Sequence, residues 1–238
     1  MKNKLALCLT LFLISVKPAL VWSQTIDEVY TKYIAALGGR ENLDAIQTMQ
    51  MEWVNTKGQR QIVYLSRPNL ALYLLTDTAS NMMVKVCNNG GMSCLSDKKI
   101  VGTDTSFRLQ FTRSSGKPSF FANRLISYKD NGYKIFLQGE DIIEGKRCFV
   151  VQLELDKKSY DLYYIDADTY RVIMSQTRYL SGPDGAQTYY SDYRQVNGVW
   201  FPFTVEDSGS SLNNSKKTYT YMKANVPMDK KMFVCPSL

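Results

Sequence analysis

Apolar side chains between residues 26 and 37 recur every three or four positions, which is the period of an α-helix with one buried face. Thr25 directly precedes this stretch and Glu28 stands three residues further on, a spacing typical of a capping box at a helix start. Gly38 and Gly39 follow and favour a helix end. The sequence therefore predicts a helix over 26–37, followed by a short second turn. Its apolar face consists of Ile26, Val29, Tyr30, Tyr33, Ile34 and Leu37.

From residue 49 onwards the apolar pattern changes to the period of two that is typical of β-strands. Met49, Met51 and Trp53 alternate with the polar residues Gln50 and Glu52. Similar runs, some alternating and some continuously apolar, continue almost to the end of the chain. The candidates from which the strands are expected are 49–54, 62–65, 70–75, 82–87, 107–112, 133–137, 147–155, 160–166, 171–179, 187–196, 201–207 and 215–224.

Turn residues separate many of these runs. Asp130-Asn131-Gly132, Pro183-Asp184-Gly185 and Asn197-Gly198 are typical hairpin turns. Repeated turns of this kind indicate a meander of adjacent antiparallel strands, and we expect about ten or eleven of them. The stretch 117–129 departs from this rhythm, because Pro118 is followed by apolar residues at helical spacing. A short second helix is expected there.

Residues 1–23 have the three-part pattern of a secretory signal peptide. Lys2 and Lys4 provide a positive start, an almost entirely apolar run follows, and Val21 and Ser23 stand at the −3 and −1 positions of a cleavage site. The run is shorter than the ~20 residues of a membrane span. The sequence therefore predicts export, cleavage after Ser23 and one mature β domain over 24–238.

A lipid anchor is not expected, because Cys8 lies inside the apolar run and follows Leu7 rather than a small residue. Removal of residues 1–23 takes away three lysines and no acid, so the formal charge falls from +7 to +4. Lys and Arg are scattered rather than gathered in a stripe, which argues against nucleic acid as a partner. The predicted location is outside the cytoplasm, where weak attraction to an anionic membrane surface is the remaining electrostatic possibility.

Four cysteines remain after cleavage, and an oxidising compartment permits disulfides between them. Cys87 and Cys94 flank Asn88-Asn89-Gly90-Gly91, a hairpin turn signal. A turn centred on Gly90-Gly91 places the two cysteines opposite each other, whereas a turn at Asn89-Gly90 offsets them by two residues. We expect a Cys87–Cys94 disulfide and leave the pairing of Cys148 and Cys235 open.

The residue types of the common catalytic sites are scarce. The chain has no histidine, which removes Ser-His-Asp and Cys-His catalysis and the commonest zinc ligand. The acids cluster at turns, as in Asp166-Ala167-Asp168, where solvated surface is the simpler explanation. No catalytic residue, cofactor or metal is therefore expected, and the protein is interpreted as a non-enzyme.

Methionine and aromatic side chains on the strands suit an apolar cavity that accepts variable ligands. For any single one of them, an ordinary packed core is the better explanation, so the argument for a cavity rests on their number. In 70–75 both faces are apolar, so the choice of positions there is arbitrary. The predicted cavity is lined by Met49, Met51, Trp53, Leu72, Leu74, Met82, Val84, Phe107, Leu109, Phe111, Tyr30 and Tyr33, with the 26–37 helix plugging it.

Several segments resemble a known family. These are Tyr33-Ile34-Ala35-Ala36-Leu37-Gly38-Gly39 with Leu43-Asp44-Ala45-Ile46, the 163–170 strand–turn–strand, the segment 189–202 and the ending 225–233. In order and spacing they are similar to outer-membrane lipoprotein-sorting-like proteins of the Bacteroidetes, which share the fold of LolA, the periplasmic lipoprotein carrier. The four mature cysteines depart from the family pattern.

This resemblance implies a half-open antiparallel β-barrel whose concave face is plugged by helices and whose cavity holds acyl chains. The expected function is that of a periplasmic carrier or binder of a lipid, acyl chain or lipoprotein. Transient contacts with a membrane surface or an envelope protein are further expected. The alternative is an envelope sensor or protein-interaction module with the same fold and no transported ligand, because one fold hosts many functions.

Overall fold

The computed structural model describes residues 24–56, 58–67, 70–77, 82–88, 93–97, 100–102, 123–208 and 215–233. The segments 1–23, 103–122 and 234–238 lie outside this part of the chain. With them lie the predicted signal peptide, the predicted strand 107–112, most of the predicted helix 117–129, and Cys235.

Two α-helices open the described chain, α1 (Ile26–Ala36) and α2 (Arg40–Ala45). The predicted capping box is confirmed, because the Thr25 side chain accepts from the Glu28 backbone N–H while the Glu28 side chain accepts from the Thr25 backbone N–H. Gly38, at φ +116°, separates the two helices. The predicted helix and its glycine end are thus present. Two short 3₁₀ helices follow later, η1 (Arg124–Ser127) and η2 (Lys230–Phe233).

All strands of the described chain belong to one antiparallel sheet in the order β6-β5-β4-β3-β2-β1-β13-β12-β11-β10-β9-β8-β7. Apart from the β1–β13 contact, every neighbour in the sheet is also a neighbour in sequence, so the predicted meander is confirmed. The strands are β1 (Thr48–Asn55), β2 (Arg60–Ser66), β3 (Leu70–Asp77), β4 (Met82–Asn88), β5 (Ser93–Asp97), β6 (Ile100–Gly102), β7 (Lys134–Ile143), β8 (Lys146–Glu154), β9 (Ser159–Asp166), β10 (Val172–Tyr179), β11 (Gln187–Val196), β12 (Val199–Ser208) and β13 (Ser215–Ala224).

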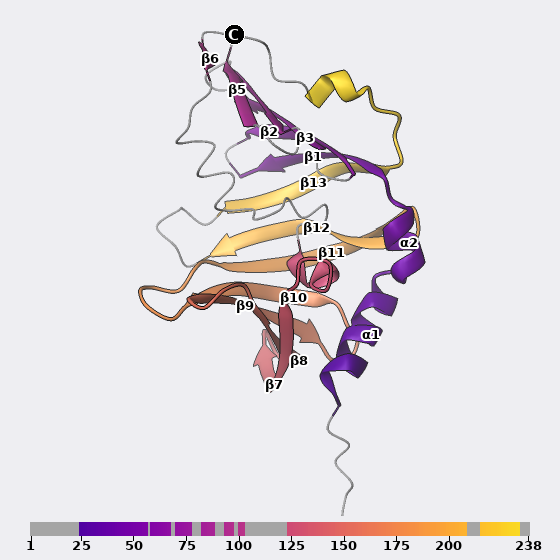
Figure 1. The fold of residues 1–238 in the computed structure, drawn as a ribbon, viewed down its shortest axis with the longest axis vertical. Helices are drawn as coiled ribbons and strands as arrows, with labels where there is room; N and C mark the ends of the chain where they lie inside the picture. The colour runs from indigo at the N-terminus through magenta and orange to yellow at the C-terminus, as the bar shows by residue number, and fades with distance from the viewer. Residues whose placement is uncertain are drawn as a thin grey trace, which may run out of the picture.

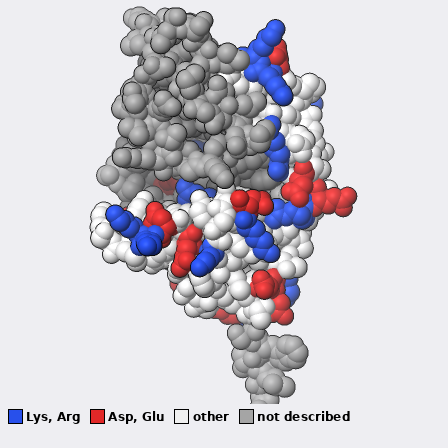
Figure 2. Space-filling view, viewed as in Figure 1, with Lys and Arg blue, Asp and Glu red and all other residues white. Residues whose placement is uncertain are grey.

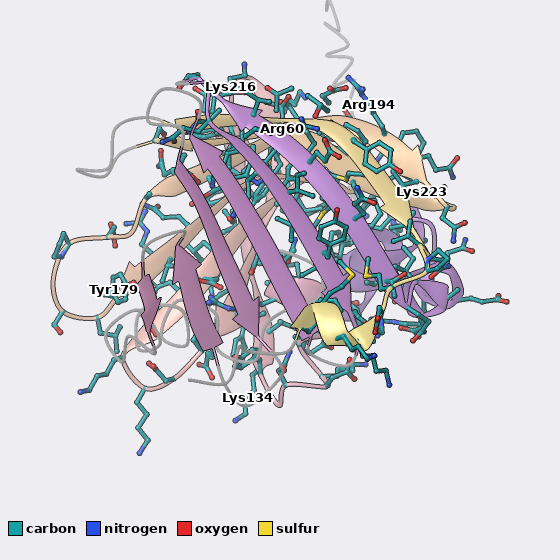
Figure 3. The ribbon with its side chains drawn as sticks, turned by 90° about the horizontal axis from the view of Figure 1, so that it is seen from above. Arg60, Lys134, Tyr179, Arg194, Lys216 and Lys223 are labelled. Carbon is teal, nitrogen blue, oxygen red and sulfur yellow. The ribbon has the colours of Figure 1, made fainter. Side chains whose placement is uncertain are left out.

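The strand count is higher than the expected ten or eleven, because β5 and β6 lack a clear alternating pattern. Seen from above, the purple strands β1–β5 lie over the orange strands of the second half, so the sheet is strongly bent (Figure 3). Within the described chain the edge strands β6 and β7 do not pair, and the sheet remains open. Helices α1 and α2 run along one end of the strands, and η1 lies in front of β10 and β11 (Figure 1).

The hydrophobic core lies between these helices and the sheet. Tyr33 of α1 and Leu43 of α2 are 1% and 0% exposed, and they pack in one cluster with Met49, Val63 and other sheet residues. Residues at helical spacing on α1 and at alternate positions on β1 and β2 thus meet in a single core. This is expected, because a period of about 3.6 residues in a helix and of two in a strand each place apolar side chains on one face.

A second apolar cluster, separate from this core, contains Cys148, Tyr164 and Met174. Cys148 is a buried free thiol, and burial raises its pKa. The register of β10 against β9 shifts between Val172 and Met174, which indicates a β-bulge at this point. For this reason Val172 joins the core beneath α1 while Met174 joins the second cluster.

The β4–β5 pairing decides between the two hairpin registers considered for the cysteines. Cys87 and Cys94 are directly opposite each other, as a turn centred on Gly90-Gly91 requires. Directly opposite positions in an antiparallel pair have Cα atoms roughly 4.5–5.5 Å apart, a separation that fits disulfide geometry. The disulfide itself stays a prediction.

Basic and acidic side chains are interspersed over the described part of the face seen in Figure 2, without a patch of one sign. Several of them form surface ion pairs, such as Arg194 with Asp192 and Arg147 with Glu140. In the described ranges, none of the helices has both the length and the apolar character needed to span a bilayer.

Candidate ligand-binding site

A small pocket of about 70 Å³ lies where α1, α2 and η1 meet β11 and β12. Apolar and aromatic residues dominate its wall, which is the usual composition of a small-molecule site. The lining residues are Tyr33, Leu37, Leu43, Asn123, Ile126, Tyr190, Tyr193, Val199, Trp200, Phe201 and Pro202.

The junction between α1 and α2 positions one side of this pocket. The backbone N–H of Trp200 donates to the Leu37 carbonyl oxygen over 2.9 Å, which ties the end of α1 to the start of β12. Gly38 lies so close to the β11–β12 turn that a Cβ atom on it would stand 2.1 Å from the Gly198 carbonyl oxygen. Because only glycine permits this approach, the sequence at 38 fixes how closely the helices cover the hairpin.

The opposite side of the pocket is formed by η1, which is held at its C-terminal part by α1 and α2. The guanidinium of Arg40 donates to the carbonyl oxygen of Ile126 at 2.9 Å and to the hydroxyl of Tyr30 at 2.8 Å. The Tyr30 hydroxyl in turn donates to the same carbonyl at 3.2 Å, and its ring packs edge-on against Tyr128. These contacts place the Ile126 side chain over the pocket.

The N-terminal part of η1 is held on the sheet by a buried ion pair. Arg124 contacts the Asp161 carboxylate of β9 at 2.9 Å, and the two side chains are 25% and 6% exposed. The same carboxylate accepts from Thr177 at 2.7 Å and from the Tyr163 hydroxyl at 3.3 Å. Burial lowers the pKa of Arg124, but the charge of Asp161, the hydrogen bond to it and the nearby phenols of Tyr163 and Tyr133 together raise that pKa above its usual value.

Polar contacts continue across the sheet beside the pocket. The hydroxyls of Ser175 and Tyr190 are 2.9 Å apart, and Thr188 donates to the Asp207 carboxylate at 2.8 Å. Burial raises the pKa of Tyr190 to about 12, so this pocket residue is a neutral phenol at physiological pH. The interior of the bent sheet therefore combines an apolar pocket with a line of hydrogen-bonded groups at its border.

The structure places the predicted cavity residues in different surroundings. Tyr33 lines the pocket, whereas Met49 is buried in the core with Met51 packed against it. Tyr30 helps to hold η1. Trp53 is half-buried, with the Lys217 ammonium 5.7 Å from its ring.

For strands β3 and β4 the register decides the face of each position. Residues 82 and 84 share the face of Met51, as expected. Across the sheet, Leu72 is in register with Tyr64 and then Gln50, and Leu74 is in register with Ile62 and then Glu52. Because Gln50 and Glu52 alternate with Met51, positions 72 and 74 lie on the face opposite Met51. Their assignment to the Met51 face is wrong, because a strand that is apolar at every position does not reveal its register. Phe107, Leu109 and Phe111 lie outside the described residues.

Most of the pocket was missed by the sequence analysis. Asn123 and Ile126 belong to a 3₁₀ turn too short for a clear pattern, and Leu43 belongs to a helix of six residues. Tyr190, Tyr193 and Phe201 lie in a segment that carries part of the family resemblance. Their aromatic density near one hairpin is the signal that could have identified them.

A wider and more open groove of about 540 Å³ lies at the far end of β7–β9. Its wall mixes apolar side chains such as Leu180 with the charged residues Lys134, Glu154, Asp156 and Lys157. We regard the smaller pocket as the candidate site because apolar and aromatic side chains dominate its wall. No cluster of three or more His, Cys, Asp or Glu side chains suited to a metal ion occurs among the residues that the structure describes.

Comparison with known proteins shows the fold. No family model matches the sequence, and no curated protein matches it. A LolA superfamily protein from Nitrosomonas europaea has a similar structure, with a TM-score of 0.55, 16% identity and 89% and 98% of the two chains covered. An outer membrane lipoprotein-sorting protein domain from Vibrio parahaemolyticus, described as putative, is also similar, with a TM-score of 0.53 and 12% identity. The match covers 87% of this chain and 94% of that one.

A DUF1329 family protein from Desulfovibrio piger is similar over 89% of this chain and 98% of its own, with a TM-score of 0.56 and 11% identity. The chain thus has a mainly β, open, LolA-like fold, and the fold part of the predicted resemblance is confirmed.

Proposed function

We propose that this protein is an exported binder or carrier of a ligand with an acyl chain, such as a lipid or a lipoprotein. The observation that carries the proposal is the pocket enclosed by α1, α2, η1 and the β11–β12 hairpin, with its apolar and aromatic wall. The LolA-like fold supports the same reading as an analogy. The pocket is the part of the molecule into which the chain of the ligand inserts.

The size of the pocket bears on how a ligand is loaded. A volume of about 70 Å³ accepts only a short part of an acyl chain. Loading therefore requires the wall to open. The smallest wall element is η1, whose polar anchors to the rest of the protein include Arg40 and Arg124. Movement of η1 away from β11 and β12 is the simplest way to enlarge the site.

Two neighbouring residues of η1 provide a matched test of the pocket. Ile126 lines it, whereas Leu125 is 0% exposed and does not. Ile126→Trp is expected to fill the space and abolish binding of an apolar fluorescent probe such as N-phenylnaphthylamine, with little loss of stability. Leu125→Trp is expected to leave probe binding in place while costing about 1–3 kcal/mol of unfolding free energy through overpacking. Probe titrations and thermal melts followed by circular dichroism measure both effects.

Undiminished probe binding by a folded Ile126→Trp variant would place the probe elsewhere and contradict the proposed site. Failure of the wild type to bind the probe, together with a large drop in melting temperature for Ile126→Trp, would instead favour a packed core. The protein would then be better described as an envelope sensor or interaction module.

We further propose that the protein acts in the periplasm as residues 24–238 with a Cys87–Cys94 disulfide. A single intact-mass measurement of protein from its native host tests both parts. The expected mass is that of the chain starting at Gln24 with two hydrogens fewer than the reduced form. The bond closes a short loop, so its loss is expected to cost only about 2–3 kcal/mol. A mass that includes Met1, or full alkylation of both cysteines without reductant, would overturn this proposal.

A further inference from the structure

Tyr33 carries a hydrogen-bond donor for which the described residues provide no acceptor. Its side chain is 1% exposed and lines the pocket. The hydroxyl oxygen accepts from the Asn123 side-chain amide at 3.0 Å, but its own O–H has no acceptor among the described residues. A buried donor left without an acceptor is costly, so such a group is expected to have a partner when the site is in use.

The other phenols of the pocket are already engaged. Tyr193 donates to the Val172 carbonyl oxygen at 2.7 Å, and the Tyr190 hydroxyl is paired with Ser175. The amide oxygen of Asn123 accepts from the Leu125 backbone N–H at 2.9 Å. Within the described pocket wall, Tyr33 is therefore the tyrosine whose hydroxyl meets only a donor, the Asn123 amide, so that its own O–H remains free to donate to a ligand. In the Ser175–Tyr190 pair either hydroxyl can be the donor.

The pocket wall carries no charged side chain in the part of the chain that the structure describes. The two basic residues that hold η1 are committed elsewhere, Arg124 to Asp161 and Arg40 to the Ile126 carbonyl oxygen and Tyr30. Burial raises the pKa of Tyr33, so its hydroxyl is a neutral donor. A carboxylate brought into this wall would lose its hydration without meeting a charged side chain of the wall itself, which is unfavourable. Arg171, which is not a wall residue, stacks on Trp200 with its guanidinium 3.9 Å from the ring centroid.

We infer that the pocket selects neutral acyl derivatives, esters or amides, whose carbonyl oxygen accepts a hydrogen bond from Tyr33. This inference rests on the proposed function, because it concerns the same pocket. The hydrocarbon part of the ligand lies against Leu43, Val199 and Phe201, and the carbonyl group faces the Tyr33 hydroxyl. Free fatty-acid anions are discriminated against by the absence of charge in the wall.

Methyl laurate, laurate and dodecane form a matched series of ester, anion and hydrocarbon. Each is titrated against the bound fluorescent probe at a mildly alkaline pH, where laurate is ionised. Wild-type protein is expected to bind methyl laurate about tenfold or more tightly than laurate. Tyr33→Phe removes only the hydroxyl. It is expected to weaken the binding of methyl laurate about fivefold to tenfold, because one neutral hydrogen bond is lost, and to leave the affinity for dodecane unchanged.

Tyr163→Phe is the matched control, because Tyr163 is another buried tyrosine and its hydroxyl contacts Asp161 instead of the pocket. It is expected to preserve the ratio of methyl laurate to dodecane affinity. Equal binding of laurate and methyl laurate by the wild type, or an unchanged ratio in folded Tyr33→Phe, overturns the inference while leaving the pocket intact. Absence of probe and dodecane binding by the wild type defeats the proposed function itself, and the inference with it.

Discussion

Gly38→Ala is expected to lower the free energy of unfolding by about 4 kcal/mol or more, an effect that few single substitutions reach. The new Cβ would stand 2.1 Å from the Gly198 carbonyl oxygen and 3.2 Å from the Val199 Cα atom. Both are backbone atoms, so no side-chain rotation can relieve the clash. The positive φ of +116° at Gly38 adds strain for any residue with a side chain. The helices must therefore move away from the β11–β12 hairpin.

Gly39→Ala separates the strain from the clash. Gly39 has φ +86° and ψ 159°, a conformation that residues other than glycine rarely adopt, but a Cβ on it would meet no atom of the described residues within 4 Å. We expect a cost of about 1–3 kcal/mol from backbone strain alone. Urea denaturation of both variants measures the difference. Equal stability of the two variants would show that the close approach of Gly38 to Gly198 does not hold the helices on the sheet.

Arg124→Met is expected to cost about 2–4 kcal/mol, because it leaves the Asp161 carboxylate buried without its counter-charge. This loss of stability is expected to be slightly smaller than the loss on breaking a fully buried ion pair. The reasons are that the Arg124 side chain is 25% exposed and that Asp161 keeps its contacts with Thr177 and Tyr163. The variant also loses the anchor of η1 on β9. We therefore expect easier opening of the pocket, seen as faster association of the apolar probe.

The double variant Arg124→Met/Asp161→Asn tests whether the charge is the cause. Removal of the unpaired carboxylate is expected to recover part of the lost stability, so that the double variant is less destabilised than the sum of the two single ones. Arg147→Met is a surface control, since Arg147 and Glu140 form an exposed pair at 3.5 Å whose loss is expected to cost less than about 1 kcal/mol. Similar losses for Arg124→Met and Arg147→Met would contradict the role given to Asp161.

These predictions concern the same piece of architecture. Gly38 holds α1 and α2 against the β11–β12 hairpin, and Arg124 holds η1 against β9. Between the two contacts lies the pocket with the Tyr33 hydroxyl in its wall. Stability of these contacts and access to the pocket are therefore coupled, which is a general feature of sites that must open to be loaded.

The sequence by itself determined the local elements of this protein. The capping box of Thr25 and Glu28, the apolar face of α1 and the alternation in β1 all depend on the backbone periods of single elements. Turn residues between successive strands likewise predicted the meander. Each of these features is set by residues close together in the chain, so a local pattern is sufficient to reveal it.

Only the tertiary structure decided how distant elements meet. Strand β1 pairs with β13, and the pocket brings Leu43 together with Phe201. Bulges add a further uncertainty, because one extra residue reverses the alternation, as between Val172 and Met174. Apolar runs such as β3 fit either face until their partners fix the register. The pocket therefore follows from the bend and register of the whole sheet, which no single stretch of the sequence encodes.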